Sequence, residues 1–382
     1  MKRIAICKEI QFSYVDGFSS IKYQLHGVEQ SMDNEGKSNS VESIFSDIPN
    51  KRNTLSFISN DISFEQITPI LDTLSKKLLT DMSLAVSINF RDCDISFSSG
   101  VDTFYGHSIG RIAIRSNGSM VYRDFVYTPR LDQLRTNLEK LLSDLIAECH
   151  YIDVCSAPTK EPTLIVLKPK ASAYVVHEVI GHLMEKDHFE RFSNTFPDRI
   201  QRGYKLFPET FNIFDDPHSA FGLRFGQYDD VGMSLQRKHV IRDGKINELI
   251  ETHRSASYYD EALYRMCNLY LSPNKSGRCY SDIIRHLNTP VVEVEDIIAG
   301  GVDPFTGQFF VCTGIRKLIR DKSNVTTLHP CTYSGNIINF ANQVVEVGND
   351  FASFTGICTK NGQSIYVGSG APTLVLSGIS RI

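Results

Sequence analysis

The sequence VVHEVIGHLME (residues 175–185) decides how the rest of this chain is interpreted. An apolar run leads into two histidines, His177 and His182, and Glu178 directly follows the first. Imidazole nitrogens bind zinc, and a carboxylate beside a bound metal can serve as a base toward water. The alternative interpretation is a helix that carries two ordinary histidines, so the motif needs support from the remainder of the chain.

The spacing of the two histidines requires an irregular helix if both are to bind one ion. They are five residues apart (H-E-x-x-x-H), whereas zinc peptidases of the H-E-x-x-H type place them four apart on one helix face. At roughly 100° per residue, an ideal α-helix would turn the two imidazoles about 140° apart, too far to share one ion. We therefore expect a π-bulge, which widens the turn. Gly181 is expected to ease that distortion because it adds no Cβ.

Composition describes an ordinary globular chain of 382 residues, with 41% apolar and 22% charged residues. A formal net charge of -4 argues against electrostatic attraction to nucleic acid or to an anionic membrane. No apolar run approaches the roughly 18 residues that a membrane span needs. Charged residues within the first nine positions interrupt the apolar run that a signal peptide would need. Nine scattered cysteines without a C-x-x-C pair predict a reduced, cytoplasmic protein.

Hydrophobic periodicity predicts two domains. In residues 1–155 it predicts an α/β layer, with helices at 64–82 and 131–149, a strand at 83–97, and a hairpin at 111–127 that turns at Asn117-Gly118. A linker rich in small and turn residues follows at Cys155–Pro162. Residues 156–382 then predict a β-rich domain that carries the histidine helix. The expected fold class is therefore α+β.

Further elements are expected within the second domain. A short buried strand at 163–167 precedes the histidine helix, and Asp243-Gly244 indicates a hairpin turn. Apolar spacing also predicts helices at Ser255–Tyr264 and Asn336–Val345. The pairs Asp215-Asp216 and Asp229-Asp230 are expected to cap turns rather than to take part in chemistry.

A zinc ion held by two histidines needs a third protein ligand if one position is to stay open for water. His188 lies six residues after His182, and Glu185 lies between them. Cys358 is a distant candidate in a segment bounded by glycines. The residues alone leave these three candidates open.

Several further segments resemble the TldD/PmbA family of metallopeptidases in order and spacing, over about residues 160–376. They are HEVIGH (177–182) followed by Glu185 and Asp187, FDDP (214–217), YDDVG (228–232), VIRDGKI (240–246), GGVDPFTGQF (300–309), GICTKNGQ (356–363) and GAPTL (370–374). Thr359 stands where the family usually has glycine. The N-terminal half is shorter than is usual in the family.

The resemblance implies a catalytic, TldD-like subunit. It assigns Zn²⁺ to His177, His182 and Cys358, and it makes Glu178 the catalytic carboxylate. The implied function is a zinc-dependent peptidase that cleaves unfolded peptides or small proteins, including removal of leader peptides during peptide maturation. It also implies that the strand after Pro372 holds a peptide by edge pairing.

The resemblance implies a dimer as well, either of identical subunits or with a family paralogue. The alternative function is the non-catalytic sister subunit, but those sisters lack the histidine-glutamate motif. Modulation of DNA gyrase is an older idea attached to the family, and the acidic net charge gives it no physical support.

Overall fold

The computed structural model describes residues 2–32, 38–45, 64–78, 81–97, 102–116, 119–126, 131–152, 161–198, 200–223, 225–255, 261–286, 289–321 and 324–381. The expected turn at Asn117-Gly118 lies outside these residues, as does the expected domain boundary between residues 155 and 156. The division into two domains at that position therefore stays a prediction.

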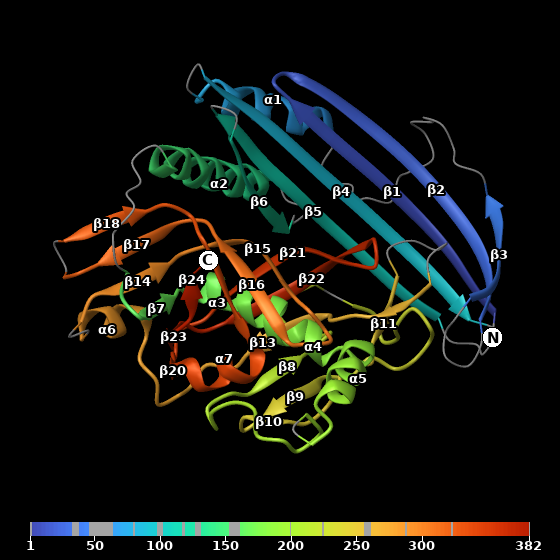
Figure 1. Cartoon of the computed structure of the whole chain (residues 1–382). Coiled ribbons are helices and arrows are strands. Elements are labelled where there is room, and N and C mark those ends of the chain that lie inside the picture. Colours follow the sequence, from blue (N-terminus) through green and yellow to red (C-terminus); the bar gives the residue numbers. More distant parts are fainter. Residues whose placement is uncertain are drawn as a thin grey trace.

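The N-terminal half contains a six-stranded antiparallel sheet in the described part of the chain (Figure 1). Its strands are β1 (Lys2–Val15), β2 (Phe18–Met32), β3 (Ser38–Phe45), β4 (Met82–Phe97), β5 (Asp102–Ser116) and β6 (Ser119–Val126), in the order β3-β2-β1-β4-β5-β6. The predicted strand at 83–97 and the predicted pairing within 111–127 are both confirmed.

Helices α1 (Phe64–Ser75) and α2 (Leu131–Ile152) pack against one face of this sheet. The strands contribute alternate residues to that face, as the period of two requires, and the helices contribute residues at three- and four-residue spacing. The buried residues are Phe12, Tyr14, Leu84, Val86, Ile88, Ile112 and Ile114 of the strands, and Ile67, Leu71, Leu74, Leu134, Leu138, Leu142, Leu145 and Cys149 of the helices. Both predicted helices are confirmed, although α1 ends earlier than expected.

The C-terminal half is built mainly of short strands. One sheet has the order β18-β17-β14-β7-β23-β20 and comprises β7 (Leu164–Leu167), β14 (Val291–Val294), β17 (Arg316–Ile319), β18 (Val325–Leu328), β20 (Val344–Val347) and β23 (Leu374–Ser377). A second has the order β10-β9-β8-β13-β22-β21 and comprises β8 (Ile213–Asp215), β9 (Lys238–Arg242), β10 (Lys245–Ile246), β13 (Asn268–Leu271), β21 (Ala352–Lys360) and β22 (Gln363–Ala371).

Smaller elements complete this half. A four-stranded sheet has the order β15-β16-β19-β24, with β15 (Ile297–Val302), β16 (Gln308–Thr313), β19 (Thr332–Asn336) and β24 (Ser380–Arg381). A two-stranded ribbon joins β11 (His253–Arg254) and β12 (Leu263–Tyr264). The remaining helices are α3 (Pro169–Val175), η1 (Val176–Gly181), α4 (His182–Met184), α5 (Lys186–Thr195), α6 (Tyr280–Arg285) and α7 (Ile337–Gln343).

The segments α3, η1 and α4 form one continuous helix at the centre of the C-terminal half (Figure 1). This central helix packs against β13, β15, β21 and β22, so strands from two sheets surround it. Its apolar side chains belong to the largest buried cluster of the described residues. A helix that is buried on most sides is held in place by packing, which is the rigidity that a functional site requires.

Most of the expected elements in this half are confirmed. Asp243 and Gly244 both have positive φ, 49° and 76°, as the predicted tight hairpin turn requires. Asn336 caps α7 by accepting a hydrogen bond from the Ile338 backbone N–H, so the helix predicted at Asn336–Val345 is confirmed. The structure is thus α+β with a β-rich C-terminal half, as expected.

Two expectations about this half are wrong. The segment predicted as a helix at Ser255–Tyr264 ends in strand β12, and its residues 256–260 lie outside the described chain. The strand after Pro372 has no free edge for a peptide, because β23 pairs with β7 on one side and β20 on the other. A buried strand with two partners has already used the backbone groups that edge pairing needs.

None of the helices in the described residues combines the length and the apolar character needed to cross a lipid bilayer.

Gly181 serves close packing rather than backbone distortion. Its φ of -57° and ψ of -51° are ordinary helical values that any residue adopts. A Cβ at this position, however, would collide with the Met266 sulfur and lie 2.6 Å from Cδ2 of Leu269. The glycine therefore lets the central helix approach β13 more closely than any other residue would allow.

Gly181→Ala is accordingly expected to lower the free energy of unfolding. Overpacking costs about 1–3 kcal/mol, whereas the gain in helix propensity returns only about 1 kcal/mol. Urea unfolding of the variant beside the wild type measures the difference. A Gly181→Ala/Met266→Ala double variant should lose less than the two single losses combined, because the new methyl group enters the space that the sulfur leaves. A Gly181→Ala protein as stable as the wild type would contradict this account.

Candidate metal centre

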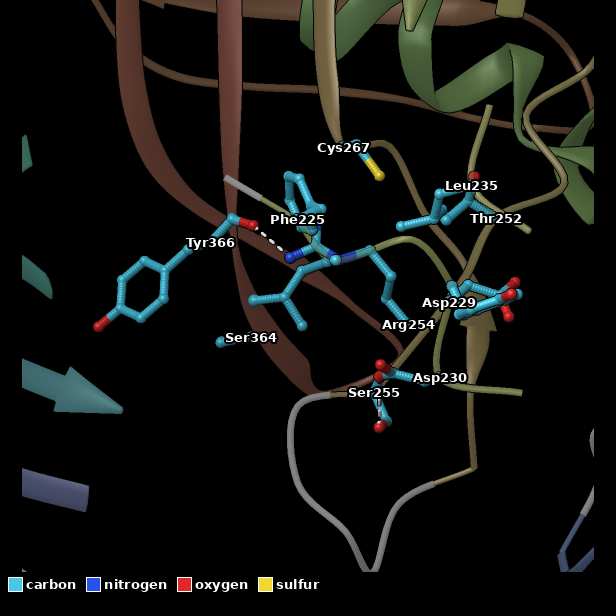
Figure 2. A pocket seen from close by; sticks show the side chains of 13 residues that line it. Phe225, Asp229, Asp230, Leu235, Thr252, Arg254, Ser255, Cys267, Ser364 and Tyr366 are labelled. Atoms are coloured by element: carbon cyan, nitrogen blue, oxygen red, sulfur yellow. Dashed lines mark hydrogen bonds between the residues drawn. The ribbon is translucent and has the colours of Figure 1, made fainter. Parts of the chain in front are cut away.

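One hollow of the described surface gathers polar side chains whose hydrogen bonds are structural (Figure 2). The Asp229 carboxylate accepts hydrogen bonds from the backbone N–H groups of Val231, Met233 and His253. Asp230 accepts from both the backbone N–H and the hydroxyl of Ser255. Asp229 therefore has the predicted turn role, whereas Asp230 joins its segment to Ser255, which is 25 residues away in the sequence.

The histidines of the central helix are brought together by a π-turn. Segment η1 runs from Val176 to Gly181, and the backbone N–H of His182 donates to the carbonyl of His177, five residues earlier. The two rings are 5.0 Å apart between centroids and meet edge to face at 85°. The expected widened turn is therefore present at the motif that required it.

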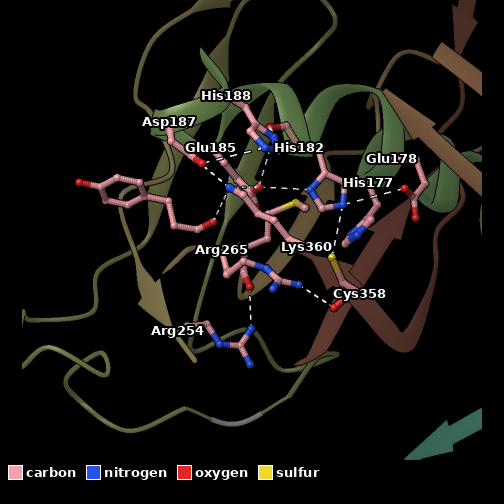
Figure 3. A network of polar contacts seen from close by, with 12 residues as sticks. His177, Glu178, His182, Glu185, Asp187, His188, Arg254, Arg265, Cys358 and Lys360 are labelled. Atoms are coloured by element: carbon pink, nitrogen blue, oxygen red, sulfur yellow. Dashed lines mark hydrogen bonds and ion pairs between the residues drawn. The ribbon is translucent and has the colours of Figure 1, made fainter. Parts of the chain in front are cut away.

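Cys358 of β21 faces both imidazoles (Figure 3). Its sulfur lies 3.3 Å from Nε2 of His182, and the three candidate ligand atoms of His177, His182 and Cys358 all lie within 4.8 Å of one another. Nitrogen and sulfur atoms bound tetrahedrally to one zinc ion lie about 3.5 Å apart, given usual bond lengths near 2.0 and 2.3 Å. Three residues that are distant in the sequence thus form a buried N,N,S cluster of zinc-ligand size.

Hydrogen bonds fix which edge of each imidazole faces the cysteine. Nδ1 of His177 lies 3.0 Å from the hydroxyl of Ser369, and Nδ1 of His182 donates to Oε2 of Glu185 at 3.2 Å. Nε2 of each ring is therefore the edge left for a metal. A carboxylate or hydroxyl on the far nitrogen is the usual support of a metal-binding histidine.

Charge favours the thiolate form of Cys358. Burial alone would raise the pKa of its thiol, but the neighbouring His182 and His177 lower that pKa well below its ordinary value. Burial alone would likewise lower the pKa of His182, but the charges of Glu185 and Cys358 raise it well above the ordinary value. The thiolate is the form of cysteine that binds metals.

The other two candidates for a third ligand are placed differently. Glu185 contacts Nδ1 of His182, on the opposite side of the ring from Cys358. His188 lies 3.7 Å from the same carboxylate, and its Nδ1 is 3.0 Å from the carbonyl oxygen of His182. The ammonium group of Lys360 is already bound to Glu185 at 2.9 Å, so an internal cation fills that position.

Glu178 lies at the open side of the cluster. Its Oε2 is 3.9 Å from Nε2 of His182, and its side chain is 16% exposed. Burial raises the pKa of this carboxyl, against the opposing effect of His177 and His182. Gly300 of β15 passes so close that a Cβ there would lie 3.0 Å from Cγ of Glu178.

Three residues that support the cluster were not expected from the sequence. They are Ser369, Lys360 and Arg265, whose guanidinium is fully buried and donates to the carbonyl of Cys358 at 2.6 Å. Of these three residues, only Lys360 could have been expected from the sequence. It lies two residues after Cys358, and because side chains alternate along a strand, both belong to the same face. Thr359, which departs from the family pattern, points outward and contacts Ser364 across the hairpin at 2.8 Å.

Comparison with known proteins gives results in agreement with these observations. The profile of the PmbA/TldA metallopeptidase C-terminal domain matches residues 160–381. A Methanothermobacter thermautotrophicus protein named metalloprotease is 26% identical over 221 residues, which cover 54% of this chain and 47% of that relative. A Saccharolobus solfataricus protein named zinc metalloprotease TldD homolog is 25% identical over 261 residues, or 63% of this chain and 55% of that relative. The chain thus spans about half the length of the curated relatives it matches.

Among solved structures, TldE from Thermococcus kodakarensis aligns with a TM-score of 0.68. The alignment covers 99% of this chain and 96% of that one, at 14% sequence identity. A likeness at this identity concerns the fold alone, and it extends over both halves of the molecule.

Asp215 is a buried carboxyl behind the centre, and it generates a pH dependence of stability. It accepts a hydrogen bond from the backbone N–H of Cys267, and burial raises its pKa to about 7 from an ordinary value of 3.8. Between these pH values the folded chain retains a proton that the unfolded chain has lost, so raising the pH weakens the fold.

The difference in unfolding free energy between wild type and Asp215→Asn should therefore fall as the pH rises from about 4 to about 7. The expected slope is up to ~1.4 kcal/mol per pH unit, because the asparagine carries no proton to lose. Urea unfolding of both proteins with a chelator present measures it, and groups common to both cancel. A difference independent of pH would show that Asp215 is ionised throughout.

Proposed function

This chain belongs to the PmbA/TldA metallopeptidase family, and from that premise we propose that it is a zinc-dependent peptidase that cleaves unfolded peptides or small proteins. The observation that carries the proposal is the convergence of His177, His182 and Cys358 beside the carboxylate of Glu178. Two imidazoles and one thiolate are ligands that zinc prefers, and a set of three leaves one position open.

The donor set fits zinc in its chemistry as well as in its size. His177 and His182 would hold the ion through Nε2, because Ser369 and Glu185 engage the other nitrogen of each ring. Cys358 would hold it through a thiolate that the surroundings already favour. When bound, zinc supplies a Lewis acid and lowers the pKa of water at the open position toward about 7.

Glu178 would do the proton transfer. Its carboxylate is close enough to the cluster to accept a proton from an attacking water and to pass it to the leaving amine. Its burial supports this role, because a carboxylate with a raised pKa accepts a proton more readily than an exposed glutamate does. The buried imidazoles and thiolate would exclude bulk water from the reacting groups.

An unfolded peptide would bind as an added strand on β15. In the described residues β15 pairs only with β16, so it is an edge strand, and it passes directly against Glu178. Edge pairing recognises the backbone and makes few demands on side chains, which suits unfolded substrates, including leader peptides. The family resemblance also supports a homodimer or a heterodimer with a family paralogue.

Glu178→Gln is expected to bind zinc like the wild type and to lose peptide cleavage by about 10²–10⁴-fold, because the amide cannot accept the proton. Elemental analysis of the purified protein and cleavage of an unfolded fluorescent peptide measure the two properties. Cys358→Ala should lose both. A wild type that purifies without zinc and retains binding to a paralogue would instead favour the non-catalytic sister function.

Two neighbouring glycines offer a matched pair of variants. In Gly300→Ala the new methyl group would lie 3.0 Å from Cγ of Glu178 and displace that side chain, whereas in Gly301→Ala it would lie 3.2 Å from the Phe310 ring. Gly300→Ala should therefore reduce kcat at least tenfold while zinc content and the urea midpoint stay close to those of the wild type. Gly301→Ala should retain kcat within about twofold. Equal kcat values for the two variants would contradict the placement of Glu178.

A further inference from the structure

The ammonium group of Lys360 is buried beside the metal centre, with 5% of the residue exposed. It donates to Oε2 of Glu185 at 2.9 Å, to Oδ1 of Asp187 at 2.7 Å and to the carbonyl of Tyr264 at 3.0 Å (Figure 3). An ammonium group has three donors, and all three are used. The side chain is therefore fixed in both position and direction.

The partner carboxylate is shared with a candidate zinc ligand. Glu185 is fully buried, and its Oε2 lies 2.9 Å from Nζ of Lys360 and 3.2 Å from Nδ1 of His182. The ion pair with Lys360 and the hydrogen bond with His182 thus meet at one buried carboxylate oxygen, so a shift of the lysine also moves the acceptor of the imidazole. The position of His182 thus depends on Lys360 through one shared oxygen.

The same lysine also fixes the strand that carries the cysteine. Residues 354, 358 and 360 lie on one face of β21, because side chains alternate along a strand. The central helix meets that face in sequence order. Tyr174 stacks on Phe354 at 5.3 Å between ring centroids, His182 meets Cys358, and the residue after α4, Glu185, meets Lys360. The ion pair is the last contact in this series, because Lys360 follows Cys358 by two residues and Glu185 follows His182 by three.

We propose that Lys360 is a positioning residue of the metal centre. Its ion pair with Glu185 sets the direction of the His182 ring and the register of β21 against the central helix, so that the Cys358 sulfur meets both Nε2 atoms. This role rests on the proposed zinc peptidase function and extends it to a residue that touches neither metal nor substrate.

Lys360→Met tests the proposal, and Lys317→Met is its matched control. Lys317 also lies between two carboxylates, at 3.0 Å from Glu295 and 3.8 Å from Glu293, but its side chain is 22% exposed and it belongs to β17 in a different sheet. Competition of the full-length proteins with a chromophoric chelator measures the dissociation constant for Zn²⁺. Absorption spectra of the Co²⁺-substituted proteins report whether the thiolate binds the metal.

Lys360→Met should weaken Zn²⁺ binding by about 10–100-fold, as loss of outer support does at metal sites, and should reduce the thiolate-to-cobalt absorption band. Lys317→Met should change neither. A lysine with a merely structural role would lower the unfolding midpoint and leave the cobalt spectrum of the folded protein unchanged. Zn²⁺ affinity within twofold of the wild type, with an unchanged cobalt band, would overturn the proposal.

The double variant Glu185→Gln/Lys360→Met guards against a single variant that does not fold, because it removes both charges of the buried pair. Asp187, the other carboxylate that Lys360 binds, is 28% exposed and can be hydrated. The same weakening and the same spectral loss are expected, because the neutral pair cannot fix the strand. If both variants fail to fold, the pair is essential to the fold rather than to ligand placement, and the proposal is wrong. A wild type that binds no Zn²⁺ would refute the proposed peptidase function itself. If the wild type binds Zn²⁺ and the Lys360 variant binds it equally well, only the role of Lys360 is refuted and the proposed function stands.

Discussion

One i→i+5 hydrogen bond, from the backbone N–H of His182 to the carbonyl of His177, is the constraint on which the centre depends. In a regular α-helix the two imidazoles would point in directions too far apart to share a ligand. The π-turn aligns them, and the dense packing of the central helix between strands of two sheets holds the turn in place. The local cost of an irregular turn is thus offset by tertiary contacts, as is common at functional sites.

Electrostatics then determines how the centre is assembled. Glu185 and Lys360 are both almost completely buried, and each of these charges depends largely on the other for compensation. Arg265 donates hydrogen bonds to the carbonyls of Cys358 and Gln363. The thiolate, the imidazoles and these supporting charges form a continuous polar network inside an apolar core. Such a network specifies one arrangement of helix and strand, because alternatives would leave buried charges unpaired.

Much of this could be predicted from the sequence, and the failures have physical causes. The unusual spacing of His177 and His182 predicted the π-turn, because helix geometry admits few ways for residues five apart to meet. The helix predicted at Ser255–Tyr264 failed at β12, where pairing with β11 overrides a weak local preference. Arg265 and Ser369 gave no signal, because their roles arise only when distant segments pack together. The packing role of Gly181 could not be predicted either, because it depends on contact with Met266, which only the tertiary structure identifies.

The supports of the centre are far apart along the chain. Cys358 follows His182 by 176 residues, and Ser369 follows His177 by 192. During synthesis from the N-terminus, the central helix is completed long before the hairpin of β21 and β22 emerges. The cluster of His177, His182 and Cys358 therefore cannot assemble before the chain has been synthesised past Cys358. The proposed peptidase would accordingly be inactive while the segments before Cys358 are still being synthesised.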